Sequence, residues 1–479
     1  MFDNARFQQL VDAGQPTGEV IATDRFLVTV NGLGGVSPEA LVLFENGDRG
    51  IVREIMPDSV LVMNLRGEET ELGSLVVLRD NTFTTPVGEG LIGRVINTLC
   101  EPLDGKGSVQ FSASWPIYNQ APGMTKRSIL NEQLPTGVTL ADTMFPIVLG
   151  QRIAMLGDTK SGKTTYLTQL GVNQLGAGRV VVYVLIGKRR VEVDQLVRTL
   201  TDTGAMAHSI VVVANVLDSL TQSYLAPYIG CTIAEYLWYT GHDTIIIYDD
   251  LSSHAKVYRE VALLAGDNPG RESYPGDMFF AHSTLLERAG KLAENGKTLT
   301  ALPVVITPGD DITAFLPTSM MSITDGQLIF DLATFRQNIK PAINTGLSVS
   351  RVGGRVQTER QKKISGAVFR HLAAYRQASE FSHFGAEVTP ETQQVLNLGK
   401  AINEAFRQTP SELYSLVEQQ LILETILAAD GQQGINVGLL KLKAKELAPN
   451  VKQDADFDVL IPQLTEMVAV QTAATAEGK

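Results

Sequence analysis

A glycine-rich segment in the first half of the chain has the residue types and spacing that suit phosphate binding. The apolar run Ile153 to Leu156 leads into Gly157-Asp158-Thr159-Lys160-Ser161-Gly162-Lys163-Thr164, which matches the pattern GxxxxGK[ST] in full. Glycines let successive backbone N–H groups surround a phosphate, and a helix that begins near Thr164 adds partial positive charge. Lys163 would reach the outer phosphates, and the Thr164 hydroxyl would ligate Mg²⁺. The segment therefore predicts a magnesium-nucleotide site.

A carboxylate at the end of a second buried strand would complete such a site. The apolar run Thr244 to Tyr248 is followed directly by Asp249 and Asp250. We expect Asp249 to hold a Mg²⁺-bound water opposite the glycine loop, with Asp250 as the second candidate. The alternative is that one of these aspartates only caps the helix that follows.

The elements that carry these residues belong to the second of three segments of different texture. Residues 1–88 hold short β-branched runs separated by turn pairs such as Asn31-Gly32 and Pro57-Asp58, which predicts a small β-barrel. A short helix near Asn4 to Asp12 is expected before it. We therefore expect the chain to begin with a β-barrel domain.

Buried strands alternate with amphipathic segments in residues 89–357, which predicts an α/β domain with a mostly parallel sheet. The strand candidates are Gln151–Leu156, Arg179–Ile186, Ser209–Ala214, Thr244–Tyr248 and Leu302–Thr307.

Residues 358–479 are predicted to form a helical domain. Ile364, Val368, Leu372 and Tyr375 recur at helical spacing. Thr409-Pro410-Ser411-Glu412 has the residue types of a helix N-cap with a capping box, so a helix is expected to begin there.

Composition limits the classes of protein to which the chain can belong. Its 479 residues are 44% hydrophobic and 19% charged, which is typical of several globular domains. The formal net charge of -12 disfavours a dedicated surface for nucleic acid or anionic membranes. No secretory signal is visible, and the apolar runs are shorter than the roughly 20 residues that cross a bilayer. Cys100 and Cys231 lack metal-ligand spacing, so we expect buried thiols.

From about Gly18 to about Gly399 the chain resembles the alpha subunits of F-type ATP synthases. The resemblance rests on the glycine loop and on these further blocks: Tyr248 to Ser252, Tyr258-Arg259, Pro269 to Glu272, Tyr274 to Asp277, His282-Ser283, Leu285 to Arg288, Ile323 to Gln327, Pro341 to Asn344 and Gly346 to Gly353. It implies a β-barrel crown, a RecA-like nucleotide domain and a helical C-terminal domain. It also implies ATP or ADP with Mg²⁺ as ligands.

The resemblance identifies position 188 as the one that separates hydrolysing from non-hydrolysing subunits. Catalytic beta subunits have a glutamate there, after a glycine at a strand end, and alpha subunits usually have glutamine. Here the strand ends Ile186-Gly187-Lys188. A charged lysine cannot accept a proton from water, so we expect a site that binds nucleotide without hydrolysing it efficiently. The alternative is that Lys188 is a solvated strand-end residue and another group supplies the base.

The resemblance assigns Arg351 as an arginine finger that reaches the γ-phosphate in a neighbouring beta subunit. Such fingers raise turnover by about 10³ to 10⁵, because a planar guanidinium neutralises charge that develops in the transition state. The alternative for Arg351 is an ion pair within its own loop.

The adenine base in this family packs between an aromatic residue, a proline and the start of the helical domain. Phe335 and Pro341 match two of these positions, Lys340 stands where an arginine is usual, and Gln408 matches one of two usual glutamines. Pro410 replaces the second glutamine. In the glycine loop, Thr159-Lys160 replaces an Arg-Gln pair, which moves a cation within the loop.

The resemblance further implies a non-catalytic regulatory subunit that alternates with beta subunits in a hexamer around a gamma subunit. The complex would couple ATP synthesis or hydrolysis to proton or sodium translocation at the cytoplasmic face of a bacterial membrane or at an organellar inner membrane. This chain would meet the membrane only through the other subunits. The family's longer N-terminal helix, which docks on a peripheral-stalk cap subunit, is not seen before Glu19, so we expect stator attachment to differ.

Two other functions compete with this one. A self-sufficient hexameric P-loop motor, such as a type III secretion ATPase or an RNA translocase of the transcription-terminator kind, would need a carboxylate at position 188. An RNA translocase would also be expected to have a basic face with exposed aromatic residues, which the net charge disfavours. The third possibility is a nucleotide-binding scaffold without a working finger.

Overall fold

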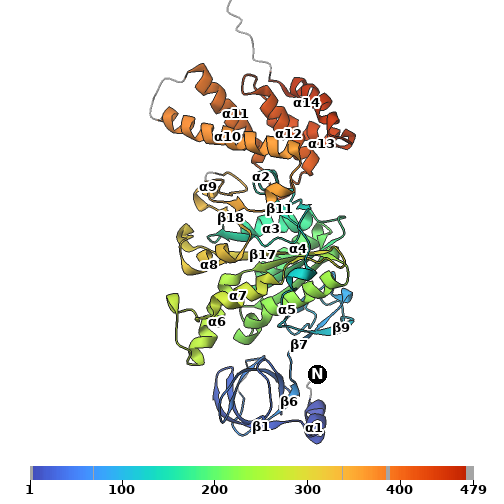
Figure 1. Cartoon of the computed structure of the whole chain (residues 1–479), viewed down its shortest axis with the longest axis vertical. Coiled ribbons are helices and arrows are strands. Elements are labelled where there is room, and N and C mark those ends of the chain that lie inside the picture. The colour runs from blue at the N-terminus through green and yellow to red at the C-terminus, as the bar shows by residue number, and fades with distance from the viewer. Residues whose placement is uncertain (1–3, 68–69, 337, 384–388, 471–479) are drawn as a thin grey trace, which may run out of the picture.

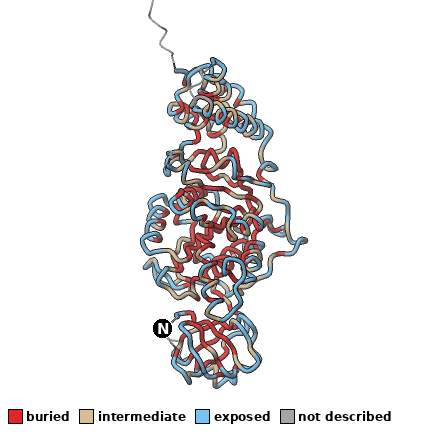
Figure 2. Tube along the Cα trace, turned by 90° about the vertical axis from the view of Figure 1, so that its left-hand side faces the viewer, coloured by how far each residue is buried: buried red, intermediate tan, exposed pale blue. Residues whose placement is uncertain are grey.

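The computed structural model describes residues 4–67, 70–336, 338–383 and 389–470. Figure 1 shows a β-barrel at one end of an elongated chain, an α/β domain in the middle and a bundle of helices at the other end. In Figure 2 the buried segments concentrate in the barrel and in the middle domain, while the outer surfaces of the helical domain are exposed. This architecture confirms the predicted fold class.

The N-terminal barrel closes through the strand order β1-β2-β5-β4-β3-β6, in which β1 also pairs with β6. Within the described residues its six strands are β1 (Thr17–Asp24), β2 (Leu27–Gly32), β3 (Leu41–Phe44), β4 (Arg49–Ile55), β5 (Val60–Asn64) and β6 (Leu75–Asp80). Val28, Val42 and Val62 fill its interior and are fully buried. The expected helix α1 (Asn4–Asp12) is present and packs Phe7 against the barrel wall. The barrel therefore closes on a β-branched core, as its sequence pattern predicts.

The middle domain is built on one large, mostly parallel sheet. In the part of the chain that the structure describes, the strand order is β19-β18-β12-β17-β15-β13-β14-β8, with β16 as a ninth strand on β17. The strands are β8 (Val95–Asn97), β12 (Ala154–Gly157), β13 (Arg179–Lys188), β14 (Ser209–Asn215), β15 (Asp243–Asp249), β16 (Gly290–Lys291), β17 (Thr298–Ile306), β18 (Gly326–Phe330) and β19 (Val349–Ser350). The five predicted strands form the centre of this sheet, and the short strands β8, β18 and β19 extend it.

Helices pack on both faces of the sheet, which explains why its strands are apolar throughout. The helices of the middle domain, not all of which contact the sheet, are α2 (Thr139–Met144), α3 (Lys163–Val172), α4 (Arg190–Asp202), α5 (Leu220–Tyr239), α6 (Leu251–Leu264), α7 (Met278–Glu287), α8 (Phe315–Ile323) and α9 (Leu332–Arg336). Helix α5 lies against β13, β14 and β15. Glu235 of α5 forms a buried ion pair with Arg288, whose Nε lies 2.7 Å from Oε1 of the glutamate. Both cysteines are buried free thiols, as predicted.

The helical domain contains α10 (Glu359–His383), α11 (Pro390–Phe406), α12 (Leu416–Ala429), α13 (Val437–Leu447) and α14 (Ala455–Val468). Ile364, Val368 and Leu372 form the buried face of α10, which confirms their predicted role.

The predicted helix start at Thr409 is wrong. Helix α12 begins at Leu416, and its capping box is formed by Ser415 and Glu418. Glu412 does accept a hydrogen bond from the Thr409 backbone N–H, at 2.7 Å, but the turn does not continue as a helix. The segment instead docks on the middle domain, where the Tyr414 N–H donates to the Gly137 carbonyl. Tertiary contacts have therefore overridden a correct local signal.

The first predicted domain boundary falls beside a strand that pairs outside the barrel. Strand β7 (Thr84–Val87) pairs with β9 (Ala113–Pro116), which lies on the middle-domain side of the boundary at residue 88. A further small pair, β10 (Gln133–Leu134) and β11 (Ile147–Val148), precedes β12. The domain limits 1–88, 89–357 and 358–479 stay predictions.

Candidate nucleotide-binding site

The glycine loop lies between strand β12 and helix α3, in the strand–loop–helix setting that its sequence predicts. Gly157 has φ +154°, and a Cβ there would come within 2.5 Å of the Phe330 carbonyl oxygen. Gly162, with φ +100°, is the residue from which α3 begins. Both positions therefore require glycine, because side chains rarely adopt this backbone conformation and one at Gly157 would also clash. The loop can in this way present its N–H groups at the amino end of α3.

Lys163 is buried inside the loop that precedes it. Its Nζ donates to the carbonyl oxygens of Gly157 at 2.7 Å and Asp158 at 2.6 Å, and to Ser161 Oγ at 3.2 Å. Burial lowers the pKa of Lys163 to about 8, against the opposing effect of Asp249 and Asp250. Its ammonium is thus held by the loop carbonyls at the position from which it can meet a phosphate.

The rest of the loop is held by a hydrogen bond from the segment that follows the neighbouring strand β17. Asp158 accepts a hydrogen bond from the Gly309 N–H at 2.8 Å and from the Thr159 N–H at 2.6 Å. The first of these contacts is the main reason that the pKa of Asp158 is lowered. Lys160 and Thr164 are exposed and line the same cavity.

Lys188 forms an ion pair with the carboxylates that follow β15. Its Nζ lies 2.7 Å from Asp249 Oδ1 and 3.2 Å from Asp250 Oδ2. Strands β13 and β15 are parallel neighbours, with Leu185 opposite Asp249, so their carboxyl ends meet. Gly187 has φ +65°, a left-handed turn that glycine allows between the end of the apolar run and Lys188.

The pKa values of Lys188 and Asp249 are both shifted at this contact. Burial by itself would lower the pKa of Lys188. The negative charges of Asp249 and Asp250 together have the larger effect, so the pKa of Lys188 is raised. Burial also raises the pKa of Asp249, and Lys188 only partly offsets this. The sequence predicted the effect of Lys188 on hydrolysis but missed its contact with Asp249.

The two aspartates have different positions and contacts. Asp249 is the strand-end residue, while Asp250 caps α6, with Oδ1 accepting from the Ser253 N–H at 2.6 Å. Asp250 is therefore the helix cap, and Asp249 is the aspartate left as the candidate for the magnesium side of the site.

A cavity of about 580 Å³ joins the glycine loop to the end of β13. Thr164, Lys188 and Asp249 line it, and Pro410 and Leu413 face them from the helical domain. Of the described carboxylates that line this cavity, Asp249 is paired with Lys188. The other, Glu192, accepts hydrogen bonds from the Arg189 N–H at 3.0 Å and from Arg189 Nε at 3.1 Å. That contact lowers the pKa of Glu192, which makes it a poor base.

The donor set around Thr164 does not fit the expected magnesium site. Asp249 was expected to accept a hydrogen bond from a metal-bound water, but an ammonium group already lies 2.7 Å from its Oδ1. Among the described residues there is also no cluster of three or more His, Cys, Asp or Glu side chains that could hold a metal. The Thr164 hydroxyl is the one predicted metal ligand that remains accessible.

The predicted adenine contacts separate into two groups. The Phe335 ring lies beside Gly162, within 4 Å of a Cβ built there, and Lys340 Nζ lies 5.0 Å from the centre of that ring. Pro341 follows directly and is half-buried. These three residues lie on the glycine-loop side of the domain.

Gln408 is buried, and its side chain hydrogen-bonds to three backbone groups. Its Nε2 donates to the carbonyls of Gly137 at 2.9 Å and Glu412 at 3.0 Å, and its Oε1 accepts from the Thr139 N–H at 2.6 Å. Both amide hydrogens are used, so Gln408 could contact a base only through its Oε1, and its role as an adenine contact stays a prediction. Its contacts join the helical domain to α2.

Arg351 lies at the far end of strand β18 from the glycine loop. Ser350 pairs with Gly326 at the start of β18, whereas Gly157 pairs with Phe330 at its end. Four strand steps separate these levels by about 13 Å. The guanidinium donates to the carbonyls of Thr324 at 3.1 Å and Met321 at 3.3 Å, and among described residues no carboxylate lies within ion-pair distance of it. The alternative of an ion pair within the loop is therefore not seen.

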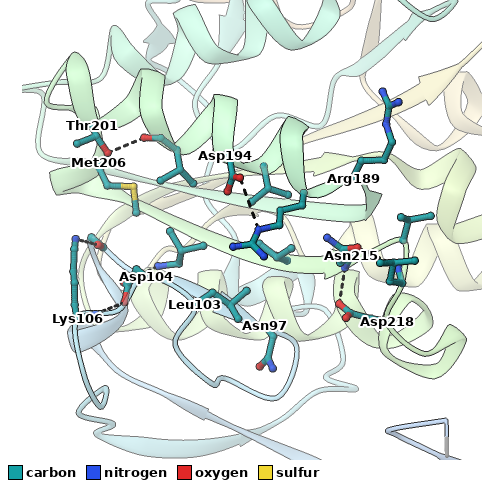
Figure 3. A pocket seen from close by; sticks show the side chains of 18 of the residues that line it. Asn97, Leu103, Asp104, Lys106, Arg189, Asp194, Thr201, Met206, Asn215 and Asp218 are labelled. Carbon is teal, nitrogen blue, oxygen red and sulfur yellow. Dashed lines mark hydrogen bonds and ion pairs between the residues drawn. The ribbon is translucent and has the colours of Figure 1, made fainter.

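Figure 3 shows residues that line a second, larger cavity of about 1130 Å³. Asp194 of α4 and Arg189, the residue before that helix, border it on one side, and Asp104 and Lys106, which follow β8, border it on the other. None of the loop residues Gly157–Thr164 lines it, so it is separate from the candidate site.

Comparison with known proteins agrees with the fold and with a nucleotide-binding domain in the middle of the chain. Residues 137–350 match the ATP synthase alpha/beta family, nucleotide-binding domain, and residues 357–456 match the ATP synthase alpha/beta chain, C terminal domain. The chain is 40% identical to ATP synthase subunit alpha of Clostridium botulinum (strain Alaska E43 / Type E3) over 94% of its length and 89% of the relative. It is 42% identical to the subunit alpha of Aquifex aeolicus over 82% of its length and 78% of that relative. Among the described helices, none is long and apolar enough to cross a membrane.

Proposed function

This chain belongs to the ATP synthase alpha/beta family, as an alpha subunit of an F-type ATP synthase, and from that premise we propose that it binds nucleotide without hydrolysing it. The observation that carries the proposal is the ion pair between Lys188 and Asp249 at the end of β13. Hydrolysis needs a carboxylate that orients and polarises the attacking water, and here that position holds a cation. Glu192, the other carboxylate of the cavity, is held by Arg189.

The residues of the glycine loop bind the phosphates of ATP or ADP. Backbone N–H groups of Gly157–Thr164 surround the phosphate chain, and Lys163 leaves the loop carbonyls to meet the outer phosphates. Phe335, Lys340 and Pro341 lie on the base side of the loop. The Thr164 hydroxyl would be available to a magnesium ion carried by the nucleotide, but Asp249 is not free to hold it.

Arg351 acts on the site of a neighbouring catalytic beta subunit. Its position one strand length from its own glycine loop supports action in trans, because an arginine side chain cannot span that distance to its own phosphates. Leu347 and Val349, next to it in the loop, are 47% and 42% exposed, as expected for an interface with a partner. In the hexamer the guanidinium would neutralise charge that develops on the partner's nucleotide.

The chain is thus proposed to alternate with beta subunits around a gamma subunit. Contact with a peripheral-stalk cap subunit and, through the rest of the complex, with a membrane at its cytoplasmic face would complete the assembly. The complex would couple ATP synthesis or hydrolysis to translocation of protons or sodium ions.

The experiment that tests the proposal measures ATPase activity of the purified chain alone and after assembly with beta and gamma subunits. The chain alone should show no more activity than its Lys163→Ala variant, and the assembled complex should be active. Robust activity of the chain alone would contradict the proposal and favour a self-sufficient hexameric motor.

A further inference from the structure

Lys188 occupies the border between a pair of carboxylates and the cavity of the nucleotide site. Its ammonium contacts Asp249 and Asp250 on one side, and the same residue lines the cavity of about 580 Å³ with Thr164 on the other. Its side chain is 19% exposed, so the ammonium is largely removed from bulk water but not sealed from the cavity.

The hydrogen bonds of this ammonium leave one donor for a ligand. A lysine ammonium has three N–H donors, and the two aspartates accept two of them. The third is free to meet an oxygen in the cavity. A phosphate oxygen held by the glycine loop is the anionic acceptor that this cavity would contain.

The ammonium of Lys188 contacts Asp249, the carboxylate that a divalent cation would otherwise contact through one of its water ligands. A Mg²⁺ ion whose water donated to Asp249 would lie directly beside the ammonium, and like charges at such distances repel strongly in a partly buried site. The ammonium also offsets one of the two negative charges of Asp249 and Asp250, which weakens the attraction of these carboxylates for a cation.

We propose that the ammonium of Lys188 is a built-in cation of this site, which takes the role of the divalent metal beside the nucleotide phosphates, so that ADP and ATP bind with little dependence on Mg²⁺. The inference rests on the proposed function, since it requires that the glycine loop binds nucleotide. It goes further, because it names the ionic form of the ligand: metal-free nucleoside di- and triphosphates bind nearly as well as their magnesium complexes.

The first test is calorimetric titration of the full-length chain with ADP, in excess Mg²⁺ and in EDTA. For the wild type, the two dissociation constants should agree within about threefold. Lys188→Gln removes the cation and frees Asp249, so its affinity in EDTA should fall by about tenfold or more, with most of that loss recovered in Mg²⁺. Arg190→Gln, an exposed charge two residues away on α4, is the matched control and should leave both constants unchanged.

A second measurement needs no variant and so does not depend on how Lys188→Gln folds. Because linkage is reciprocal, ADP bound to the wild type should hold Mn²⁺ no more tightly than free ADP does, as measured by electron paramagnetic resonance. Mn²⁺ held at least tenfold more tightly in the complex, or wild-type ADP affinity at least tenfold higher with Mg²⁺, would overturn the inference.

Failure of the inference can be told from failure of the proposed function. Strong binding that depends on Mg²⁺ and is lost in Lys163→Ala would overturn only the role of Lys188. Absence of binding by the wild type in both conditions, equal to that of Lys163→Ala, would overturn the nucleotide site itself and the inference with it.

Discussion

The Nζ of Lys188 lies 2.7 Å from Oδ1 of Asp249, across the carboxyl ends of the neighbouring parallel strands β13 and β15. Under the proposed function, the lysine at position 188 both takes the place of the base that hydrolysis needs and pairs with the carboxylate that a metal-bound water would need. These two consequences are testable separately, by turnover and by the metal dependence of binding.

The ion pair at the strand ends should contribute to the stability of the domain. Lys188→Gln leaves the buried carboxylate of Asp249 without its charged partner, which should lower the free energy of unfolding by about 1–3 kcal/mol. The double variant Lys188→Gln/Asp249→Asn should recover part of that loss, because two amides can hydrogen-bond without a buried charge. Urea unfolding of the wild type and of the single and double variants measures this coupling, and strictly additive effects would show that the pair is not coupled.

Arg351 should affect turnover in the assembled complex without affecting nucleotide binding by this chain. Arg351→Ala should lower the hydrolysis rate of the complex with beta and gamma subunits by about 10³ to 10⁵, because the guanidinium stabilises the transition state in the partner's site. Arg355→Ala, an exposed arginine in the same loop, is the control. If Arg351→Ala complexes turned over at the wild-type rate, the chain would be a scaffold without a working finger.

The buried pair Arg288–Glu235 should be needed for stability more than for function. Both side chains are 2% exposed, and the guanidinium also donates to the Ile117 carbonyl at 2.8 Å. Arg288→Met should lower the free energy of unfolding by about 3–5 kcal/mol, because it leaves a buried charge unpaired, and Arg288→Met/Glu235→Met should recover most of it. Lys297→Ala breaks the more exposed pair with Asp243 and should cost at most about 1 kcal/mol. Equal losses for the two single variants would contradict this ranking.

Two buried histidines should make the protein less stable below neutral pH. His254 Nδ1 lies 3.1 Å from His282 Nε2, and burial lowers their pKa values to about 3 and about 4. Between about pH 6.5 and pH 4 the unfolded chain therefore binds more protons than the folded chain, so the free energy of unfolding falls as pH falls, by at most about 1.4 kcal/mol per pH unit for each histidine.

His282→Asn should reduce that slope, which chemical unfolding at a series of pH values would measure. His371→Asn, in the helical domain, controls for loss of an imidazole outside this pair. A His282→Asn slope as steep as that of the wild type would show that the pair does not carry the pH dependence.

The sequence predicted those features whose signals are local and long. Strands β13 and β15 are runs of β-branched residues and could be placed closely, and the glycine loop is a complete motif between a strand and a helix. The short strands β8, β18 and β19 gave no such run, since pairing with longer neighbours defines them. Thr409 shows the opposite case, in which a good local cap is overridden by docking of its segment on the middle domain.

The candidate site was predictable in its parts but not in its contacts. Lys188 and Asp249 each end a strand that the sequence predicted, yet their contact depends on β13 and β15 being adjacent in the sheet. Pairing every charged residue at a predicted parallel strand end with the others would have found it. The hydrogen bonds of Gln408 to Gly137 and Thr139 depend on how the helical domain docks, which no local pattern encodes.

The fate of ATP bound to this chain shows whether the site holds nucleotide without hydrolysing it. The purified chain would be loaded with radiolabelled ATP, freed of unbound nucleotide and sampled over hours for the ratio of ATP to ADP, with Lys163→Ala as the control for specific loading. The bound label should remain ATP, because both described carboxylates that line the cavity, Asp249 and Glu192, are paired with cations and cannot polarise water at the end of β13. Conversion of the bound ATP to ADP by the chain alone within minutes would contradict the proposed function.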